Sequence, residues 1–551
     1  MKKISLTAIS IFVIFLVSCS KNDGVIKGSP KPPNTAMSGT FYIDDINGND
    51  NNDGKSSGSP WKTITKVNEQ IFAPGSQILF KAGGVWNGKM LQFKGSGTSG
   101  SPIIIAKYGE GKLPQFNAAG IFKAAIYLYN QQYIEIKEVE VTNYNPQEEG
   151  GISLQAWEAK NISDYAAVTT PPQAVKNNSF KFGIYVEAKD TGAVKHIYLQ
   201  KVLVHGVNGA INQDNEDTKD NGGVAFVVTG SGKKTWFEDI LIEECTIRDV
   251  DRTGLYTSSS WGTRTLTSNS NWTPTTNLII RNNIFKKSGA NALIVRVSDT
   301  PLIERNLFDS CAIKGSGNAA FCFNTDNATF QYNEARFTKA NVDDRDAGGL
   351  DSDYRTKNTF IQYNWLHDND FGMLVTGGGG VFNDNTVVRY NIIERDGLLP
   401  HPDHGKFIFK VSGAATNTKI YNNTVYIAPS QSATALIRHA NWTVWPSTTN
   451  YSNNIFYNEG SGSIVNTGSS TGNSYSNNMV VVNNVAISNN VAAGTTSFVN
   501  INAGPNGYKL KTGSAALAAG ISIPNNGGKD YFNASLPSAS PNIGAYEGPG
   551  L

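Results

Sequence analysis

Cysteine is scarce in this sequence: its 551 residues include only 4. One of them, Cys19, lies near the N-terminus, and the others are Cys245, Cys311 and Cys322. Three is an odd number, and their spacing matches no metal-ligand pattern, so neither a disulfide framework nor a cysteine metal site is predicted. We interpret all three as small buried hydrophobic residues. The alternative is a single disulfide between Cys311 and Cys322.

The sequence also lacks an excess of charge of one sign. Its 47 Lys and Arg residues against 45 Asp and Glu residues give a formal net charge of +2. No stretch is rich in Lys or Arg, so nucleic acid is not expected as a partner. Methionine is rare as well, with 5 residues, whereas Gly reaches 55 and hydrophobic residues make up 39%. Together with abundant Asn, Ser and Thr, this composition is typical of a β-rich extracellular protein.

The one notable apolar run is Ile4–Val17, which follows Met1-Lys2-Lys3 and is too short to span a bilayer comfortably. It ends in Leu16-Val17-Ser18-Cys19, which resembles a bacterial lipoprotein signal. The resemblance implies that Cys19 is the lipid-modified first residue of the mature chain and holds it on the cell envelope, in the bacterial outer membrane. The alternative is an ordinary secretory signal with an incidental cysteine. In both cases we expect an exported protein whose only membrane contact is this lipid.

A short motif recurs along the second half of the chain, in which an asparagine follows an apolar or aromatic residue three positions earlier. Successive marked asparagines are 23 to 32 residues apart. Repeats of this size, made of short β-branched strands and polar turns, fit the coils of a parallel β-helix better than a helical solenoid. We expect the asparagines to form an inward hydrogen-bonded ladder, with Cys245 at the equivalent place on an earlier coil. The marked residues are Asn283, Asn306, Asn333, Asn364, Asn391, Asn423, Asn454 and Asn478.

The segment that begins the folded body supports the same fold. Phe41–Asp44, the turn-rich Asn47–Gly54, Pro60–Ile64 and Pro74–Lys81 follow in an order that resembles the opening of pectate-lyase-like right-handed parallel β-helix proteins. The resemblance implies an all-β, single-stranded right-handed parallel β-helix with a short N-terminal helical cap. We interpret the acidic turn at 47–54 as an Asx-rich turn, with a Ca²⁺ site as the alternative.

We therefore divide the chain into four parts. Residues 1–19 form the signal peptide and residues 20–39 a flexible tether. Residues 40–497 form the β-helix. Residues 498–551 depart from the repeat and are expected to cap the last coil, whose strand edges would otherwise be exposed to aggregation.

One predicted strand carries two carboxylates. In Gly349-Leu350-Asp351-Ser352-Asp353, alternation of side chains puts Asp351 and Asp353 on the same face, about 6 to 7 Å apart at Cα. Two acids on one outer face repel each other and are disfavoured unless they have a use. A glycoside hydrolase needs such a pair, one carboxyl to protonate the leaving oxygen and one to attack or to activate water.

Aligning the strand after each ladder asparagine predicts a polar row on the same outer face. In this alignment, the fourth position of each strand faces solvent at about 4.8 Å per coil. We expect the row to line a sugar-binding groove. Its members are Arg296, Asn324, Asp353, Thr376, Lys410 and His439.

Further candidates lie near these strands. His367 and Asp368, on the turn after Asn364, are candidates for a partner catalytic group. Arg252, Tyr256 and Trp261 are expected to supply an anion clamp and a stacking platform for sugar rings. The His-containing insert 400–405 is expected to form a groove wall.

The region around Asp351 resembles exported bacterial β-helix proteins that degrade carbohydrates, a superfamily with both hydrolases and lyases. Three functions remain open. The first is a monomeric glycoside hydrolase that needs no cofactor and cleaves an anionic polysaccharide, uronate-containing or sulfated and fucan-like, with Asp351 and Asp353. The second is a Ca²⁺-dependent polysaccharide lyase with Lys410 as the base and with Asp343, Asp344, Asp351 and Asp353 as metal ligands. The third is a non-catalytic surface glycan-binding lipoprotein.

Overall fold

The computed structural model describes residues 35–160, 180–209, 211, 219, 221–341, 344–463, 465–481, 498–501 and 503–551. The signal peptide, the lipidation site Cys19 and residues 20–34 of the tether lie outside the described residues, as does Asp343. Residues 36–551 form one compact unit. In the part of the chain that the structure describes, none of the helices has the length and apolar character needed to span a bilayer.

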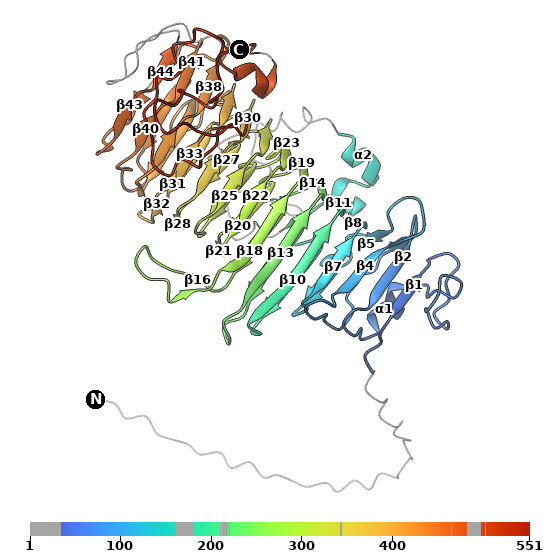
Figure 1. Cartoon of the computed structure of the whole chain (residues 1–551). Helices are drawn as coiled ribbons and strands as arrows, with labels where there is room; N and C mark the ends of the chain where they lie inside the picture. The colour runs from blue at the N-terminus through green and yellow to red at the C-terminus, as the bar shows by residue number, and fades with distance from the viewer. Residues whose placement is uncertain are drawn as a thin grey trace, which may run out of the picture. The chain divides into compact units, whose positions relative to one another are not determined.

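Parallel strands in this unit stack into three long sheets, and from β4 to β42 each coil passes through the first, second and third sheet in turn (Figure 1). The first sheet contains β1 (Thr40–Ile43), β2 (Gln77–Lys81), β4 (Ile103–Tyr108), β7 (Ile134–Lys137), β10 (Ala193–Gln200), β13 (Trp236–Glu243), β18 (Thr275–Arg281), β21 (Ser298–Asp299), β22 (Leu302–Glu304), β25 (Thr329–Gln331), β29 (Phe360–Gln362), β33 (Val387–Arg389), β37 (Lys419–Tyr421), β40 (Asn450–Ser452) and β43 (Ser474–Ser476). The second contains β3 (Val85–Asn87), β5 (Gln115–Asn117), β8 (Glu140–Asn143), β11 (Leu203–Val207), β14 (Thr246–Val250), β19 (Ile284–Ser288), β23 (Leu307–Asp309), β26 (Glu334–Arg336), β30 (Trp365–His367), β34 (Ile392–Glu394), β38 (Thr424–Ile427), β41 (Ile455–Asn458) and β44 (Met479–Val481).

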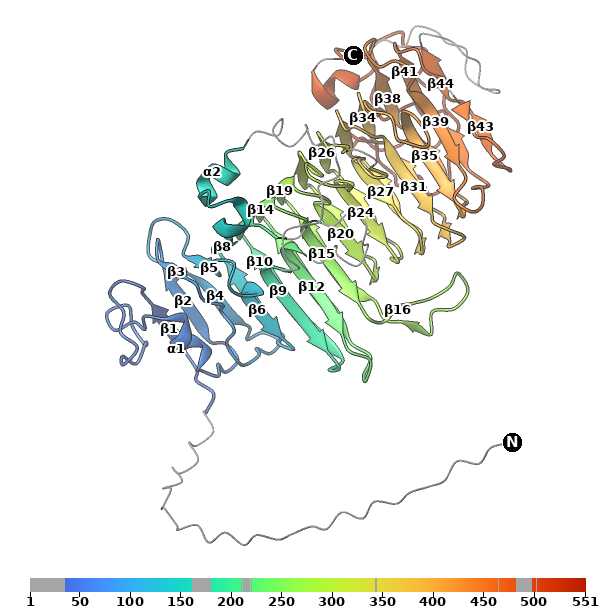
Figure 2. The same ribbon diagram turned by 180° about the vertical axis from the view of Figure 1, so that it is seen from behind.

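In the view from behind, the strands of the third sheet lie next to one another (Figure 2). It contains β6 (Ala124–Tyr129), β9 (Phe182–Lys189), β12 (Gly222–Thr229), β15 (Thr253–Ser259), β20 (Leu293–Arg296), β24 (Ala320–Phe323), β27 (Leu350–Ser352), β31 (Met373–Gly377), β35 (Phe407–Gly413), β39 (Ala435–Ala440) and β42 (Val465–Asn466). Smaller elements are the hairpin β16 (Gly262–Thr263) and β17 (Asn271–Trp272), the short sheet β28 (Thr356–Lys357), β32 (Asn383–Asp384) and β36 (Ala415–Thr416), and the helices α1 (Ile64–Asn68), η1 (Pro146–Glu149), α2 (Leu154–Glu158) and η4 (Gly504–Tyr508). The predicted all-β parallel β-helix is confirmed.

The asparagine ladder is present as predicted. Each marked asparagine is buried, and the Nδ2 group of one donates to Oδ1 of the next at 2.9 to 3.0 Å, from Asn283 through to Asn478. The backbone N–H of Cys245 donates to Asn283 Oδ1 at 2.9 Å, which puts Cys245 at the head of the row. The ladder satisfies buried turn groups that water cannot reach.

Inward side chains of all three sheets fill one continuous apolar core. On the third sheet, Leu293, Leu350, Met373 and Ile437 are at most 1% exposed. The three cysteines of the body are free thiols buried in this core, so their interpretation as small hydrophobic residues is confirmed and the alternative disulfide is wrong.

Separate segments cover one end and one side of the β-helix. The predicted N-terminal helical cap is α1, which begins after Thr63; the Thr63 hydroxyl accepts from Lys66 N–H at 3.1 Å, a typical N-cap. Its apolar residues Ile64 and Val67 are buried in the core. The C-terminal segment packs against the outer side of the last coils, where Tyr508 and Ile543 are buried. This differs from the expected cap across the last coil, because the apolar residues to be covered face outward from the second sheet.

Candidate active site

The strands around β27 present two outward rows of side chains. In one row, Asp351 on β27 pairs with Phe321 on β24 and Leu374 on β31, and Leu374 pairs with Lys410 on β35. In the other row, Arg296 pairs with Phe323, and Thr376 pairs with Ser412. Asp353 follows β27 directly, and its N–H donates to Cys322 O at 3.0 Å. The two carboxylates thus leave one strand toward the same side, as predicted.

The predicted row is wrong in part, because the register of neighbouring strands differs from the sequence alignment. Phe323, not Asn324, pairs with Arg296, and Asn324 is buried, with Oδ1 accepting from Arg264 Nε at 2.7 Å. His439 pairs with Val411 and is buried inside, 2.9 Å from the Tyr451 hydroxyl. A shift of one residue turns a side chain to the opposite face of a strand, which explains both errors. Neither residue belongs to the outer groove.

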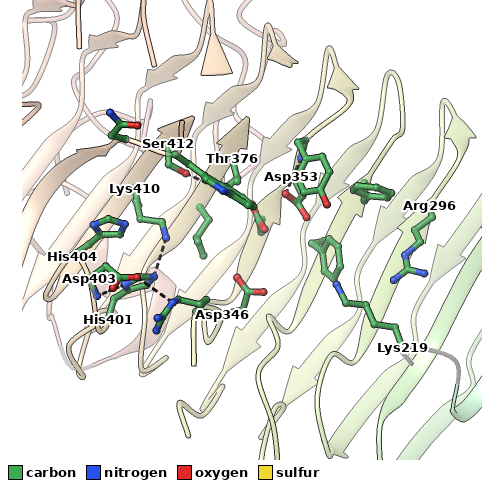
Figure 3. Close-up of a pocket in the computed structure, with 18 residues that line it drawn as sticks. Lys219, Arg296, Asp346, Asp353, Thr376, His401, Asp403, His404, Lys410 and Ser412 are labelled. Carbon is green, nitrogen blue, oxygen red and sulfur yellow. Dashed lines mark hydrogen bonds and ion pairs between the residues drawn. The ribbon is translucent and has the colours of Figure 1, made fainter. Parts of the chain in front are cut away.

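A pocket of about 640 Å³ opens on the outer face of the third sheet. Figure 3 shows its labelled side chains converging from successive coils and from the loop before β35. Its lining combines charged side chains with the apolar side chains of Phe321, Phe323 and Leu374. The lining residues are Lys219, Arg296, Phe321, Phe323, Arg345, Asp346, Asp351, Asp353, Tyr354, Leu374, Thr376, His401, Asp403, His404, Lys410, Ser412, Asn441 and Trp442.

Asp351 is the most deeply buried acid of the pocket, with 4% of its surface exposed. Burial raises the pKa of its carboxyl well above the ordinary value, and the nearby Asp353 and Asp346 act in the same direction. Asn318 Nδ2 donates to Asp351 Oδ2 at 3.2 Å, while Oδ1 has no hydrogen-bond partner among the described residues. A carboxyl in this setting favours its protonated form, and a protonated carboxyl can act as an acid.

Asp353 and Asp346 complete an acidic group. Asp353 is partly exposed, and its Oδ1 accepts from Tyr354 N–H at 2.8 Å. Asp346 comes from the loop before β27, where its N–H donates to the Ser316 hydroxyl at 3.2 Å. Sequence reasoning did not single out Asp346. It lies in a loop outside the repeat, and nothing in the sequence indicates that this loop brings it back to the outer face of β27.

Cations stand on both sides of these acids. Arg296 lies on β20, two coils before β27, and Lys410 lies on β35, two coils after it. At a coil spacing of about 4.8 Å, each of these strands is about 10 Å from β27. Burial lowers the pKa of the Lys410 ammonium, although the acids nearby act in the opposite direction. Lys219 and Arg345 also line the pocket. The site therefore combines charges of both signs along one strip.

An aromatic wall borders the carboxylates. The Phe323 and Tyr354 rings meet edge to face at 4.7 Å, and the Tyr354 and Trp442 rings do so at 5.9 Å. Trp442 is 47% exposed. A Cβ at Gly378 would lie 2.6 Å from Tyr354 Cδ1, so the glycine at this position is what lets the ring pack. Sequence reasoning missed Trp442, although a tryptophan in a polar loop was a usable signal.

The insert 400–405 forms a pocket wall, as expected. His401 and Gly405 bridge across the loop through two backbone hydrogen bonds of 3.1 and 3.0 Å. The His401 Nε2 atom lies 3.3 Å from Lys410 Nζ, and Asp403 Oδ2 lies 3.1 Å from Arg345 Nε.

Other predicted residues lie away from the pocket. His367 and Asp368 are at β30 on the second sheet, where His367 Nδ1 is 2.7 Å from Asp368 and Asp368 pairs with Arg395 at 2.7 Å. The predicted partner role for this pair is wrong, because β30 belongs to a different sheet from β27. Their mutual pairing instead raises the pKa of His367 to about 9 against the effect of burial.

The predicted clamp and platform are also not among the lining residues. Arg252 and Tyr256 are buried, and Tyr256 pairs with Ile294 in an apolar cluster further along the strip. Trp261 packs against the core beside the hairpin. Tyr354 and Trp442 line the pocket and offer the stacking surface that was predicted for Tyr256 and Trp261.

The predicted metal ligands come together only in part. Asp351 and Asp353 line the pocket, whereas Asp344 does not. The Asp344 carboxyl accepts from Asn341 N–H. Burial raises the pKa of Asp344 to about 6. Asp343 lies outside the described residues. In the acidic turn at 47–54, Asn49 Oδ1 accepts from Asn51 N–H and Asp53 Oδ1 accepts from Lys55 N–H, which fits the Asx-turn interpretation. Asp50 instead accepts from the backbone of Lys62 and Thr63, just before α1.

Comparisons with known proteins identify the fold. Residues 124–435, more than half of the chain, match the family described as the right handed beta helix region. A Lacto-N-biosidase of Bifidobacterium longum subsp. longum is 26% identical over 533 aligned positions, which cover 83% of this chain and 31% of that protein. The chain thus spans about a third of that relative's length.

Two solved structures share the architecture. A GH136 lacto-N-biosidase from Eubacterium ramulus superposes with a TM-score of 0.55 at 18% identity, over 80% of this chain and 67% of that one. XylC in complex with xylose gives a TM-score of 0.51 at 11% identity, over 92% of this chain and 98% of that one. These likenesses concern the fold alone, and the match to the family model confirms the predicted handedness of the β-helix.

Proposed function

Since the chain belongs to the right-handed β-helix family, we propose that it is a carbohydrate-active enzyme, and specifically a glycoside hydrolase that cleaves an anionic polysaccharide. The observation that carries the proposal is the pair Asp351 and Asp353, which one strand brings into the same pocket. The likeness to a Lacto-N-biosidase over most of this chain points to the same class of chemistry.

In this mechanism, the two carboxyl groups have different roles because their surroundings differ. Asp351, whose pKa burial raises, is the general acid that protonates the leaving glycosidic oxygen. Asp353, more exposed and held by Tyr354 N–H, is the carboxylate that attacks the anomeric carbon or activates water. Asp346 stands beside them and favours the protonated form of Asp351 by repulsion.

The anionic nature of the substrate is inferred from the cations of the pocket. Arg296 and Lys410 flank the acids on opposite sides, and Lys219 and Arg345 add to them. A polymer crossing the acids would meet a cation on either side of the cleaved bond, which favours uronate or sulfate groups there, as in a fucan-like polymer. The exposed Trp442 ring offers a face on which a sugar can stack.

A polysaccharide lyase is the second candidate, and Lys410 favours it. Burial lowers the pKa of this lysine, and a neutral amine can take the proton next to a uronate carboxylate while the bond to the leaving oxygen breaks. In that case Asp351 and Asp353 would hold Ca²⁺. A lyase product absorbs in the ultraviolet and its formation stops with chelator, whereas hydrolase products do neither.

The test of the hydrolase is a screen of purified polysaccharides for new reducing ends, followed by Asp353→Asn. We expect this variant to lose at least about 100-fold in kcat, because it lacks the attacking or activating carboxylate. The matched control is Asp239→Asn, which removes a carboxylate from β13 on the first sheet. Wild-type turnover in Asp353→Asn would remove Asp353 from the mechanism, and binding without any product would identify a glycan-binding protein.

The remaining expectations stay proposals. We propose that the enzyme acts as a monomer without a required cofactor, and that lipid on Cys19 anchors it to the cell envelope. Incorporation of labelled palmitate in the wild type and its loss in Cys19→Ala would test the anchor.

A further inference from the structure

The loop between β34 and β35 brings three metal-binding side chains together. The backbone of His404 donates to His401 O at 3.2 Å, and the His401–Gly405 bridge closes the loop. One potential ligand atom each of His401, Asp403 and His404 lies within 4.8 Å of the other two. Figure 3 shows these three side chains beside Lys410 at one end of the pocket.

The two histidine side chains of the loop are held in place by local contacts. Asp403 N–H donates to His401 Nδ1 at 3.1 Å, which fixes the His401 ring within the loop. Imidazole ligates metals in its neutral form, through a ring nitrogen that carries no proton. His401 is 3% exposed, and its ring stacks on that of His404 with centroids 4.6 Å apart, so the pair is already ordered.

The charges near the loop leave room for a cation. Arg345 pairs with Asp403, but both side chains are more than half exposed, and such pairs contribute little. Lys410 Nζ lies 3.3 Å from His401 Nε2, and this long side chain has to move aside if that nitrogen binds the ion. Asp346, Asp351 and Asp353 line the same pocket and attract a cation.

We propose that His401, Asp403 and His404 form a binding site for a divalent transition-metal cation of the Zn²⁺ type on the wall of the pocket. Two nitrogens and one carboxylate oxygen are a donor set that suits Zn²⁺ and not Ca²⁺, which prefers oxygen ligands. Three protein ligands leave a coordination position for water or for an oxygen of the bound sugar. Small rotations of Asp403 and His404, both partly or fully exposed, bring the ligand atoms to one ion.

The experiment uses the full chain after treatment with chelator. Zn²⁺ is added in a calorimetric titration and in a thermal-unfolding series, and neither readout depends on activity. We expect one ion per chain and a rise in Tm with Zn²⁺ concentration. The variant His404→Ala should lose at least about 100-fold in affinity, since a ligand is removed.

The matched control is His196→Ala. His196 also contacts two acids, Glu135 and Asp239, but on the first sheet. This variant should bind Zn²⁺ like the wild type. Tm without metal verifies that both variants fold. Equal Zn²⁺ affinity in His404→Ala and wild type, or no stoichiometric binding to the wild type, would overturn the site. A wild type that binds Zn²⁺ but cleaves no polysaccharide would refute the proposed function and leave this site standing.

Discussion

Asp351 shows at the scale of one residue how a site can be built at the expense of stability. The carboxyl is buried and its pKa is raised in the folded protein. Above the ordinary pKa of about 4, the unfolded chain releases the proton and the folded chain retains it, so stability falls as pH rises toward the folded pKa. Below pH 4, both states are protonated and this loss disappears.

We therefore predict that Asp351→Asn is more stable than the wild type at pH 8 and about equally stable at pH 4, while hydrolysis is lost. The amide oxygen can still accept from Asn318, so the packing is kept. Denaturant unfolding at the two pH values measures the difference. A variant less stable than the wild type at pH 8 would show that ionised Asp351 is well solvated or paired.

Trp442 is a second test at this scale. Its exposed ring borders the carboxylates, and loss of a stacking face weakens sugar binding by about 1 kcal/mol or more. We predict that Trp442→Ala raises KM about fivefold or more, with a smaller effect on kcat, in assays with the polysaccharide identified by the screen. Leu266→Ala removes a similarly exposed apolar side chain outside the pocket lining and should leave KM unchanged.

At the scale of the element, the coils depend on the buried asparagine ladder. Asn364 donates to Phe330 O at 3.0 Å and to Asn391 Oδ1, and its own Oδ1 accepts from the Asn333 backbone. Each strand pair is short, so this row of amides fixes which turn stacks on which.

We predict that Asn364→Ala lowers the free energy of unfolding by about 3 kcal/mol or more, because two buried backbone groups lose their partners. Asn450→Ala, which removes a half-exposed amide from β40, should cost about 1 kcal/mol or less. Chemical denaturation of both variants measures this. Similar small losses in the two would mean that water replaces the ladder amide.

At the scale of the whole molecule, the C-terminal segment and the β-helix share an apolar interface. Tyr508 is 1% exposed and contacts Phe498 and Tyr426, with ring centroids 5.3 and 6.3 Å away. The segment also bonds to the coils through Asn422, whose Nδ2 donates to Asn542 O at 3.0 Å. It acts as a side cover for the second sheet.

We predict that Tyr508→Ala destabilises this cover by about 3 kcal/mol or more and exposes residues 498–551 to limited proteolysis before the coils unfold. Lys511→Ala, at an exposed position of the same segment, should be cut as slowly as the wild type. Simultaneous loss of coils and segment would show that they unfold as one unit.

The sequence by itself determined the repeat. Each coil needs an inward amide at the same turn, so the regular spacing of the asparagines from Asn283 to Asn478 was enough to predict the coils. It also determined that Asp351 and Asp353 share a face, since alternation within one strand is a local property. Only the tertiary structure decided which residues join them. Loops of unequal length separate the second sheet from the third, so the register that excluded Asn324 and His439 could not be read from the repeat. Trp442 and Asp346 reach the acids from loops, where position depends on packing against the whole stack and leaves no periodic mark in the sequence.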